Sequence, residues 1–320
     1  SQPFWQSILH QKPWPNIKSY FIFRAARIIP AYYVALTILI LVSGYWRFPQ
    51  AWSDILLHYS FLFNYVEFSF FSINAPFWSL AVELQFYCLL PVLFFVVRSQ
   101  SLTLISFYLL LFSFLSYALH VAVITQINSP ILWPENTILT WVRPNGAVVT
   151  HSLLGHIPHF IIGIVTGGLL CKLQSNRPNF FEAGRGHFDV VFGCCLCVII
   201  LLISTPLGNY IQIPFGRYGL PLIPTLIAFL IFSAPITKYF ARILESHFIK
   251  KFGQLSYGVY IYHLPTLMFV DTTMASLDRD AREQWYFLAF FALLLTLFFA
   301  LLSSYLIERP ILKLVKNKLS

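Results

Sequence analysis

Residues 285–307 read WYFLAFFALLLTLFFALLSSYLI, a run of 23 residues without a charged side chain. A helix crosses the hydrocarbon core of a membrane with about 20 mostly apolar residues, so this run predicts a membrane-spanning helix. Seven further stretches predict spans in the same way, at residues 25–45, 77–97, 102–125, 152–171, 188–205, 218–236 and 255–271. The sequence therefore predicts an all-α fold, a polytopic integral membrane helical bundle of about eight spans.

A ninth apolar stretch, residues 55–66 (ILLHYSFLFNYV), is shorter and is interrupted by His58 and Asn64. A segment of this length and polarity is typical of an interfacial or re-entrant helix rather than of a crossing. We therefore expect one such helix in addition to the eight spans.

The composition excludes a soluble domain. Of the 320 residues, 58% are hydrophobic and only 10% are charged, and the mean hydropathy is +0.71. Soluble domains carry about 25% charged residues. The formal charge of +9 comes without a long basic run or a nucleic-acid-binding motif, so the expected partner is the lipid bilayer and not a nucleic acid.

The distribution of basic residues predicts the orientation of the chain. With residues 1–24 placed in the cytoplasm and the spans alternating, 16 of the 21 Lys and Arg residues fall on the inner side. The outer side receives Arg47, Arg143, Arg217, Arg279 and Arg282. This bias predicts that both termini are cytoplasmic. It also predicts a single membrane domain over residues 1–320, with a cytoplasmic lead-in at 1–19 and a basic cytoplasmic tail at 308–320.

Glu83 and His263 are ionisable residues that approach the middle of predicted spans. A charged side chain at the centre of a membrane helix costs about 2.5–3.5 kcal/mol on insertion scales, so such a residue is a candidate for function. Glu83 lies about 9 Å below the outer end of its span, at 1.5 Å per residue, and His263 lies about halfway along its own. Together they predict an acid/base couple near the midplane. The alternative for each is a structural hydrogen bond between helices.

Arg24 and Arg27 are three residues apart at the predicted start of the first span, so both guanidinium groups lie on one helix face. Arginine suits phosphate, and a helix N-terminus adds a favourable dipole. The pair therefore predicts a cytoplasmic phosphorylated ligand, or alternatively side chains that extend to lipid headgroups. Glu308 is a natural partner for an arginine at this face.

Histidines and cysteines predict no metal site. His156 and His159 share a helix face in the 152–171 span, with His151 nearby, but no carboxylate or Cys of the same helix completes a ligand set. Polar packing or substrate hydrogen bonding is the expected role. The five cysteines lie mostly in apolar runs and lack zinc-knuckle spacing, so we expect them to fill helices.

Four segments together resemble the membrane-bound acyltransferase 3 family. They are RAARIIPAYY (24–33), FWSLAVELQFY (77–87), SYGVYIYHLP (256–265) and IERP (307–310). They are similar to the family's R-x-x-R-I-x-P, W-S-L-x-x-E-x-x-F-Y, S-Y-x-x-Y-x-x-H-x-P and closing E-R-P stretches. The resemblance covers the chain from residue 20 onward. It also implies two preceding helices, absent from this sequence, of which the first carries an Arg and a His central to acyl transfer.

The resemblance implies an acyltransferase, of the kind that transfers groups other than amino-acyl groups, in the cell (plasma or inner) membrane. Such an enzyme takes an acyl group, often acetyl from acetyl-CoA, and delivers it to a hydroxyl of a surface polysaccharide or another glycoside. Arg24 and Arg27 would hold the CoA phosphates, and Glu83 and His263 would be the catalytic residues. The residues expected to line the reaction cavity or donate to the oxyanion are Trp78, Ser79, Tyr87, Tyr257 and Tyr260.

Two other functions stay open on the sequence. Midplane ionisable residues and Pro- or Gly-interrupted helices are also features of secondary transporters and lipid-linked sugar exporters. A non-catalytic membrane scaffold is the third possibility. The acceptor would be set by the outward loops 46–76, 126–150 and 206–216, which are rich in aromatic and amide side chains. The oligomeric state is not determined by the sequence.

Overall fold

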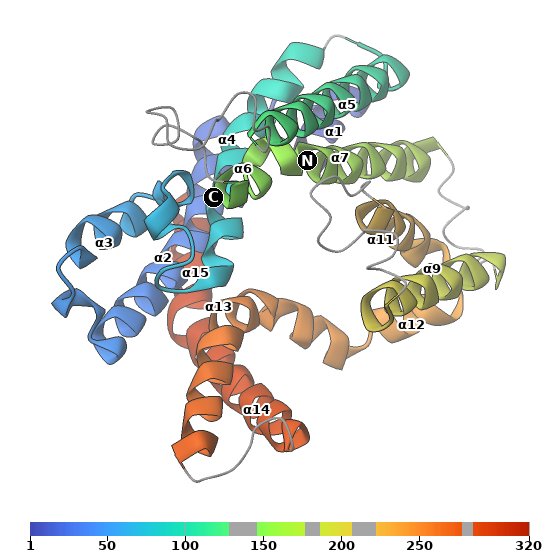
Figure 1. The fold of residues 1–320 in the computed structure, drawn as a ribbon. Coiled ribbons are helices and arrows are strands. Elements are labelled where there is room, and N and C mark those ends of the chain that lie inside the picture. The colour runs from blue at the N-terminus through green and yellow to red at the C-terminus, as the bar shows by residue number, and fades with distance from the viewer. Residues whose placement is uncertain (99, 128–145, 177–185, 207–221, 277–283, 320) are drawn as a thin grey trace. The chain divides into compact units, whose positions relative to one another are not determined.

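The computed structural model describes residues 1–98, 100–127, 146–176, 186–206, 222–276 and 284–319. Within these ranges the chain is helical and contains no strand (Figure 1), so the predicted all-α class is confirmed. The α-helices are α1 (Gln2–His10), α2 (Ile17–Ser43), α3 (Ala51–Tyr59), α4 (Trp78–Val97), α5 (Leu102–Ile127), α6 (Gly146–Thr150), α7 (Leu153–Asn176), α9 (Gly186–Ser204), α11 (Leu222–Ser233), α12 (Tyr239–Leu244), α13 (His247–Ser276), α14 (Trp285–Ser303) and α15 (Arg309–Leu319). The short turns are η1 (Tyr45–Arg47), η2 (Phe63–Tyr65), η3 (Glu67–Ser69), η4 (Ala75–Phe77), η6 (Ala234–Ile236) and the π-helical η7 (Ser304–Glu308).

Six helical segments of the described chain are long and apolar enough to cross a membrane. They are Ile17–Ser43, Ala75–Val97, Leu102–Ile124, Val148–Asn176, Gly186–Ser204 and Trp285–Leu319. These segments carry six of the eight predicted spans, and the chain is a multi-pass membrane protein. Long rows of exposed Phe and Leu side chains, as on α14, are what lipid-facing helices require.

The other two predicted spans fall on helices of a different kind. The stretch 218–236 coincides with the apolar segment Leu222–Ile236, which is shorter than a full crossing; its first residues, 218–221, lie outside the described ranges. The stretch 255–271 lies inside α13, whose 30 residues begin with a more polar portion that carries Lys250 and Lys251. The number of spans and the orientation of the termini stay predictions.

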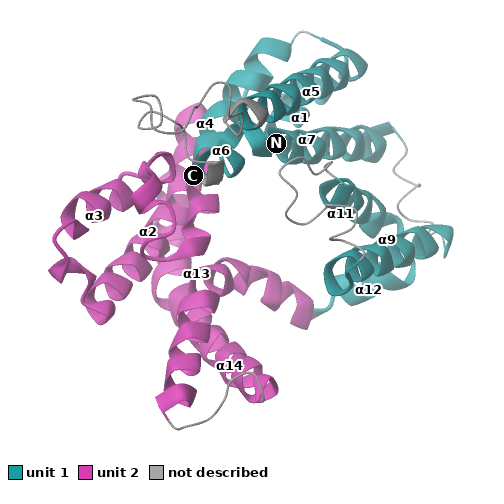
Figure 2. Cartoon of the chain, in the orientation of Figure 1, with its two compact units in different colours: residues 1–15, 85–246 teal, residues 16–84, 247–320 magenta. Residues whose placement is uncertain are grey.

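The chain divides into two compact units (Figure 2), which we describe separately. Unit 1 comprises residues 1–15 and 85–246, and unit 2 comprises residues 16–84 and 247–320. Helix α4 is shared, because its residues up to Leu84 belong to unit 2 and the remainder to unit 1. The prediction of a single domain over residues 1–320 stays a prediction.

In unit 1 the predicted lead-in is a helix packed on a span. Trp5 of α1 is fully buried, and its indole Nε1 donates to the carbonyl oxygen of Ile164 in α7 at 2.9 Å. Gly168 permits this approach, since a Cβ there would lie 2.7 Å from the Trp5 ring. The first residues of the chain are therefore anchored to α7 by a tryptophan.

Also in unit 1, a carboxylate joins the ends of two apolar helices. Asp189, near the start of α9, accepts hydrogen bonds from the backbone N–H groups of Lys238, Tyr239 and Phe240 at 2.9, 2.9 and 3.2 Å. These groups lie just after the apolar segment Leu222–Ile236 and begin α12. Because unpaired N–H groups at a helix start need acceptors, this contact fixes the start of α9 beside the end of that segment.

In unit 2, α13 and α14 cross as an antiparallel pair. Gly258 packs against Ala300, where a Cβ on the glycine would lie 2.8 Å from the Ala300 Cα. Farther along, Thr266 Oγ1 lies 2.5 Å from Thr296 Oγ1. From the first contact to the second, the residue number increases along α13, from Gly258 to Thr266, and decreases along α14, from Ala300 to Thr296. The two helices therefore run in opposite directions.

The hydrophobic core of unit 2 lies around the middle of α2. Tyr32 is fully buried, with its ring 4.5 Å from the Phe61 ring and 4.8 Å from the Phe77 ring, between centroids. Leu36 and Phe63 belong to the same core. This packing holds α2, the turns after α3 and the start of α4 together, and the polar residues considered next are mounted on these elements.

Candidate active site

Ser79 on α4 and Tyr260 on α13 are joined by a hydrogen bond, although they are 181 residues apart in sequence. Ser79 Oγ lies 2.5 Å from Tyr260 Oη, and Tyr260 Oη donates to the carbonyl oxygen of Pro76 at 2.5 Å. Ser79 Oγ itself lies 3.4 Å from the Pro76 carbonyl oxygen, so the two hydroxyls and this carbonyl form one hydrogen-bonded group. Asn74 adds a further link to α13, because its Nδ2 donates to the carbonyl oxygen of Ile261 at 3.2 Å.

Glu83 lies one helical turn beyond Ser79 on the same face of α4. Its side chain is half-buried and lies within electrostatic range of Tyr257 and Tyr260 on α13. Glu83, one of the two predicted catalytic residues, therefore lies near the two tyrosines of the SYGVYIYHLP segment. Its catalytic role stays a prediction.

His263 lies at the exposed edge of the same face of α13. Its Nδ1 lies 2.7 Å from the carbonyl oxygen of Tyr260, and the two rings are 5.7 Å apart. A carbonyl can only accept, so Nδ1 carries the proton, and in the neutral imidazole Nε2 then has the lone pair. The arrangement leaves Nε2 as the atom able to accept a proton. The structure places His263 and Glu83 in one unit, each beside Tyr260.

Glu308 joins this region to the first arginine motif. It is 8% exposed, lies in the π-helical turn η7 and accepts a hydrogen bond from Ser303 Oγ at 3.0 Å. Arg27 on α2 and Arg309 are within electrostatic range of its carboxylate. A π-helical turn next to Pro310 is a local irregularity of the kind that often marks functional positions.

Tyr257 lies between Glu308 and Glu83 in this set of polar residues. It lies within electrostatic range of both Glu308 and Glu83, and its hydroxyl donates to the carbonyl oxygen of Ile28 on α2 at 2.6 Å. A row of polar side chains thus runs through unit 2 from α2 to the start of α4. We call it the polar row: Arg27, Glu308, Tyr257, Glu83, Tyr260 and Ser79.

The arginine pair sits differently from its predicted place. Helix α2 begins at Ile17, where the side chain of Asn16 caps it by accepting from the Ser19 N–H at 3.0 Å. Arg24 and Arg27 are therefore about 10 and 15 Å along the helix, beyond the first turn in which the helix dipole acts. The prediction that the helix dipole contributes to phosphate binding at Arg24 and Arg27 is therefore wrong. Arg27 is exposed and Arg24 is half-buried, with its guanidinium 5.7 Å from the Tyr20 ring.

Two of the proposed oxyanion donors are already engaged. The hydroxyls of Tyr257 and Tyr260 each donate to a backbone carbonyl, so either would have to release that bond to serve an oxyanion. Trp78 packs its ring parallel to that of Phe70, 6.5 Å away. Tyr87 lies one helical turn beyond Glu83 on α4, in the part of this helix that belongs to unit 1.

The histidines of α7 stay consistent with polar packing. The rings of His156 and His159 are 5.3 Å apart, and His156 Nδ1 lies 3.0 Å from the carbonyl oxygen of Ser152. Among the described residues, no group of three or more His, Cys, Asp or Glu side chains has an arrangement that could hold a metal ion. In the predicted acceptor loops, Trp133, Asn136, Trp141, Asn145, Asn209 and Tyr210 lie outside the described residues.

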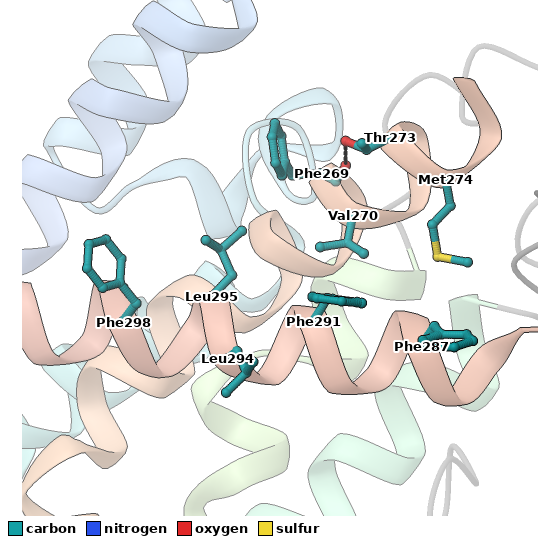
Figure 3. Close-up of a pocket in the computed structure, with 9 residues that line it drawn as sticks. All are labelled: Phe269, Val270, Thr273, Met274, Phe287, Phe291, Leu294, Leu295 and Phe298. Atoms are coloured by element: carbon teal, nitrogen blue, oxygen red, sulfur yellow. Dashed lines mark hydrogen bonds between the residues drawn. The ribbon is translucent and has the colours of Figure 1, made fainter. Parts of the chain in front are cut away.

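An apolar cavity of about 630 Å³ lies between α13 and α14 (Figure 3). It is lined by Phe269, Val270, Thr273, Met274, Phe287, Phe291, Leu294, Leu295 and Phe298. Its one hydroxyl, on Thr273, donates to the carbonyl oxygen of Phe269. The cavity contains none of the predicted site residues and offers a sugar no hydrogen-bonding side chain that is free, so the polar row and not this cavity is the candidate active site.

A second polar cluster was missed by sequence reasoning, which took His58 as an interruption of an apolar stretch. Helix α3 carries Asp54 and His58 four residues apart, and both side chains are buried. The i, i+4 spacing of an acid and a histidine was a usable signal. The hydropathy of the stretch 55–66 hides this signal, because most of its residues are apolar.

A family model described as an acyltransferase domain matches residues 8–309. The chain therefore belongs to the acyltransferase 3 family, and the resemblance carried by the four segments is confirmed. It is a membrane acyltransferase. Comparisons with curated proteins and with solved structures gave no match.

Proposed function

We propose that this membrane acyltransferase transfers an acyl group, acetyl in the simplest case, from acyl-CoA to a hydroxyl of a cell-surface polysaccharide or another glycoside. The observation that carries the proposal is the polar row, which links the arginine motif to Glu83 and Ser79 through buried or half-buried side chains. Polar groups inside an apolar helix bundle cost free energy. Their convergence from α2, α4, α13 and η7 is what a reaction site needs and what packing alone does not require.

The reaction transfers the acyl group from the sulfur of CoA to the oxygen of the acceptor hydroxyl. The acceptor hydroxyl oxygen attacks the thioester carbonyl carbon, a C–O bond forms, the C–S bond breaks, and CoA leaves as the thiol once it takes up a proton. The hydroxyl proton passes to a base. Glu83 is the leading candidate because it is half-buried and lies within electrostatic range of the tyrosines of α13, and His263 Nε2 is the second because its Nδ1 is held by Tyr260.

The donor would bind through its phosphates. Arg27 is exposed and Arg24 lies one helical turn away on α2, so both can reach an anion from one face. In the proposed orientation this end of α2 is cytoplasmic, where acyl-CoA is made, and the enzyme resides in the cell (plasma or inner) membrane. Trp78, Ser79, Tyr87 and Tyr260 are proposed to line the acceptor and thioester region.

The test is acyl transfer in membranes that contain the protein, with radiolabelled acetyl-CoA and a glycoside acceptor. Glu83→Gln is expected to lower kcat by about 100-fold or more, the usual range for a lost acid or base. Arg27→Ala is expected to raise the KM for acetyl-CoA by about 10-fold, since a charged hydrogen bond contributes about 1.5–3 kcal/mol. Glu245→Gln and Arg98→Ala, at exposed positions outside the polar row, are the matched controls.

Wild-type kinetics in both site variants, at equal expression, would contradict the site assignment. The same assay separates the enzyme from the alternative of a secondary transporter or lipid-linked sugar exporter, because a transporter would move label across vesicles without forming an acyl ester. Membership in the acyltransferase family favours the enzyme.

A further inference from the structure

Asp54 is the centre of a buried hydrogen-bond cluster outside the polar row. It is 1% exposed, and its Oδ1 lies 3.1 Å from Nδ1 of the equally buried His58. Tyr45 Oη donates to Asp54 Oδ2 at 2.6 Å, and Oγ of the fully buried Ser69 donates to Asp54 Oδ1. One carboxylate therefore ties together η1, α3 and η3.

Asp54 is ionised in this setting. Burial by itself would raise the pKa of its carboxyl, but hydrogen bonds from His58, Ser69, Ser72 and Tyr45 outweigh burial and lower the pKa to about 2. A carboxylate holds such donors more strongly than a neutral acceptor does. The cluster is thus a strong local tie rather than an incidental contact.

His58 supports the tie instead of acting on a substrate. Its Nδ1 faces both Asp54 Oδ1 and the Asp54 carbonyl oxygen, 3.0 Å away, and its ring stacks on Phe63 at 4.2 Å. Its carbonyl oxygen accepts from the Tyr32 hydroxyl of α2 at 3.1 Å. Nε2 is buried and makes no hydrogen bond with the residues that the structure describes, so no substrate reaches it in this arrangement.

The segment held by Asp54 leads directly into the candidate active site. We call residues 67–77 the connector. Its Phe70 stacks on Trp78, its Asn74 is bonded to the backbone of Ile261, and its Pro76 carbonyl receives the Tyr260 hydroxyl. Three contacts of the site are therefore mounted on one short segment, which has no regular helix of its own beyond single turns.

We propose that Asp54, whose carboxylate is held by Tyr45, is a positioning residue for acyl transfer: through Ser69 it fixes the connector, and through the connector it fixes Trp78 and Tyr260. The proposal rests on the proposed function, because it takes the reaction site to lie around Ser79 and Tyr260. Asp54 itself does not touch substrate. Displacing the connector would misplace the tyrosine and tryptophan relative to the thioester, and misplacement by about 1 Å can cost about 100-fold in rate.

The kinetic test uses Asp54→Asn and the isosteric Tyr45→Phe, with Tyr65→Phe at an exposed position as the matched control. Both cluster variants are expected to lower kcat by about 10- to 100-fold while the KM for acetyl-CoA stays unchanged, since the arginines lie on α2 and not on the connector. Combining Tyr45→Phe with Tyr260→Phe should cost less than the product of the single effects, because both act on one arrangement. Multiplicative effects, or a raised KM for acetyl-CoA with unchanged kcat, would overturn the proposal.

Hydrogen exchange provides a measurement that does not depend on activity. The backbone bonds from Ser72 N to Ser69 O and from Phe77 N to Asn74 O report on the connector. In both cluster variants these amides are expected to exchange faster than in the wild type and in Tyr65→Phe, and unchanged exchange would overturn the positioning role. If the wild type transfers no acyl group at all, the proposed function fails while this measurement still decides whether Asp54 holds the connector. Tyr45→Phe keeps the test available if Asp54→Asn does not fold.

Discussion

Tyr260 contacts three parts of the site, two through its hydroxyl and one through its backbone carbonyl. Its hydroxyl is hydrogen-bonded to Ser79 and donates to the Pro76 carbonyl, and its backbone carbonyl oxygen lies 2.7 Å from His263 Nδ1. Tyr260 belongs to α13, whereas the two groups that its hydroxyl contacts lie at the start of α4 (the Ser79 hydroxyl) and just before it (the Pro76 carbonyl). The hydroxyl therefore joins the two helices that carry the proposed catalytic residues.

Removing that hydroxyl is expected to impair catalysis more than folding. Tyr260→Phe should lower kcat by about 10-fold or more and destabilise the protein by only about 0.5–1.5 kcal/mol, the usual net contribution of a hydrogen bond. Acyl transfer and thermal unfolding of the purified protein measure the two effects. Tyr286→Phe, an exposed tyrosine on α14, is the control, and equal kinetics for the two variants would contradict the role of Tyr260.

Asp54 gives a pH dependence with a defined sign. Its pKa is lowered from 3.8 to about 2 in the folded protein, so the unfolded state binds its proton first as the pH falls. The stabilisation is present above about pH 4 and is lost as the pH falls through about 2. We expect the wild type to lose about 1–3 kcal/mol more stability than Asp54→Asn between about pH 5 and pH 2.

Thermal unfolding in detergent across this range measures the difference between the two proteins, which removes the contribution of every other carboxylate. Parallel stability curves for wild type and Asp54→Asn would show that Asp54 is not tied as the structure indicates.

At the scale of elements, the crossing of α13 and α14 depends on a glycine. A Cβ at Gly258 would lie 2.8 Å from the Ala300 Cα and 3.0 Å from its Cβ, closer than packed backbones allow without a shift. This explains in physical terms why a glycine stands inside the SYGVYIYHLP segment. The pair also carries Tyr257, Tyr260 and His263, so its spacing sets how the polar row meets α4.

Gly258→Ala is expected to destabilise the protein by about 1–3 kcal/mol through overpacking. Gly253→Ala, in the same helix but with no neighbouring atom within 4 Å of the added Cβ, is expected to be neutral or slightly stabilising, since alanine has the higher helix propensity. Thermal unfolding of the two variants side by side is the measurement. Equal stability would mean that the helices do not approach at Gly258.

At the scale of the whole molecule, the number of spans and the orientation of the termini are predictions that labelling can test. Six helical segments of the described chain meet the requirements of a membrane span, whereas the charge distribution favours eight spans with both termini inside. The antiparallel pairing of α13 with α14 is what the eight-span arrangement requires of residues 255–271. The eight-span arrangement also requires the start of α9 to lie beside the end of segment Leu222–Ile236, and the Asp189 contact holds them in this way.

Cysteine labelling decides the orientation. In a background without the native cysteines, an impermeant thiol reagent applied to intact cells should label Glu67→Cys, because the connector lies in a predicted outer loop. Gln100→Cys and Lys318→Cys should react only after the membrane is opened, since they lie on the predicted inner side with most basic residues. Labelling of Gln100→Cys and Glu67→Cys from the same side would rule out the predicted alternation.

The sequence by itself determined the class of this protein: a helical, multi-pass membrane protein of the acyltransferase 3 family. It could do so because hydropathy and charge act over neighbouring residues, and because each of the four family segments is short and contiguous. It also singled out Arg27, Glu83 and His263, which are conspicuous only against an apolar background. Their roles stay predictions.

Only the tertiary structure decided which polar side chains meet. The Ser79–Tyr260 bond, the approach of Arg27 to Glu308 and the Asp54 cluster join residues on different elements. The start of α2 at Ile17, which moved the arginines away from the helix end, was set by the cap at Asn16 and not by hydropathy. Contacts of this kind depend on how helices cross and where loops fold back, and these geometries arise from packing over the whole unit, which no local pattern in the sequence encodes.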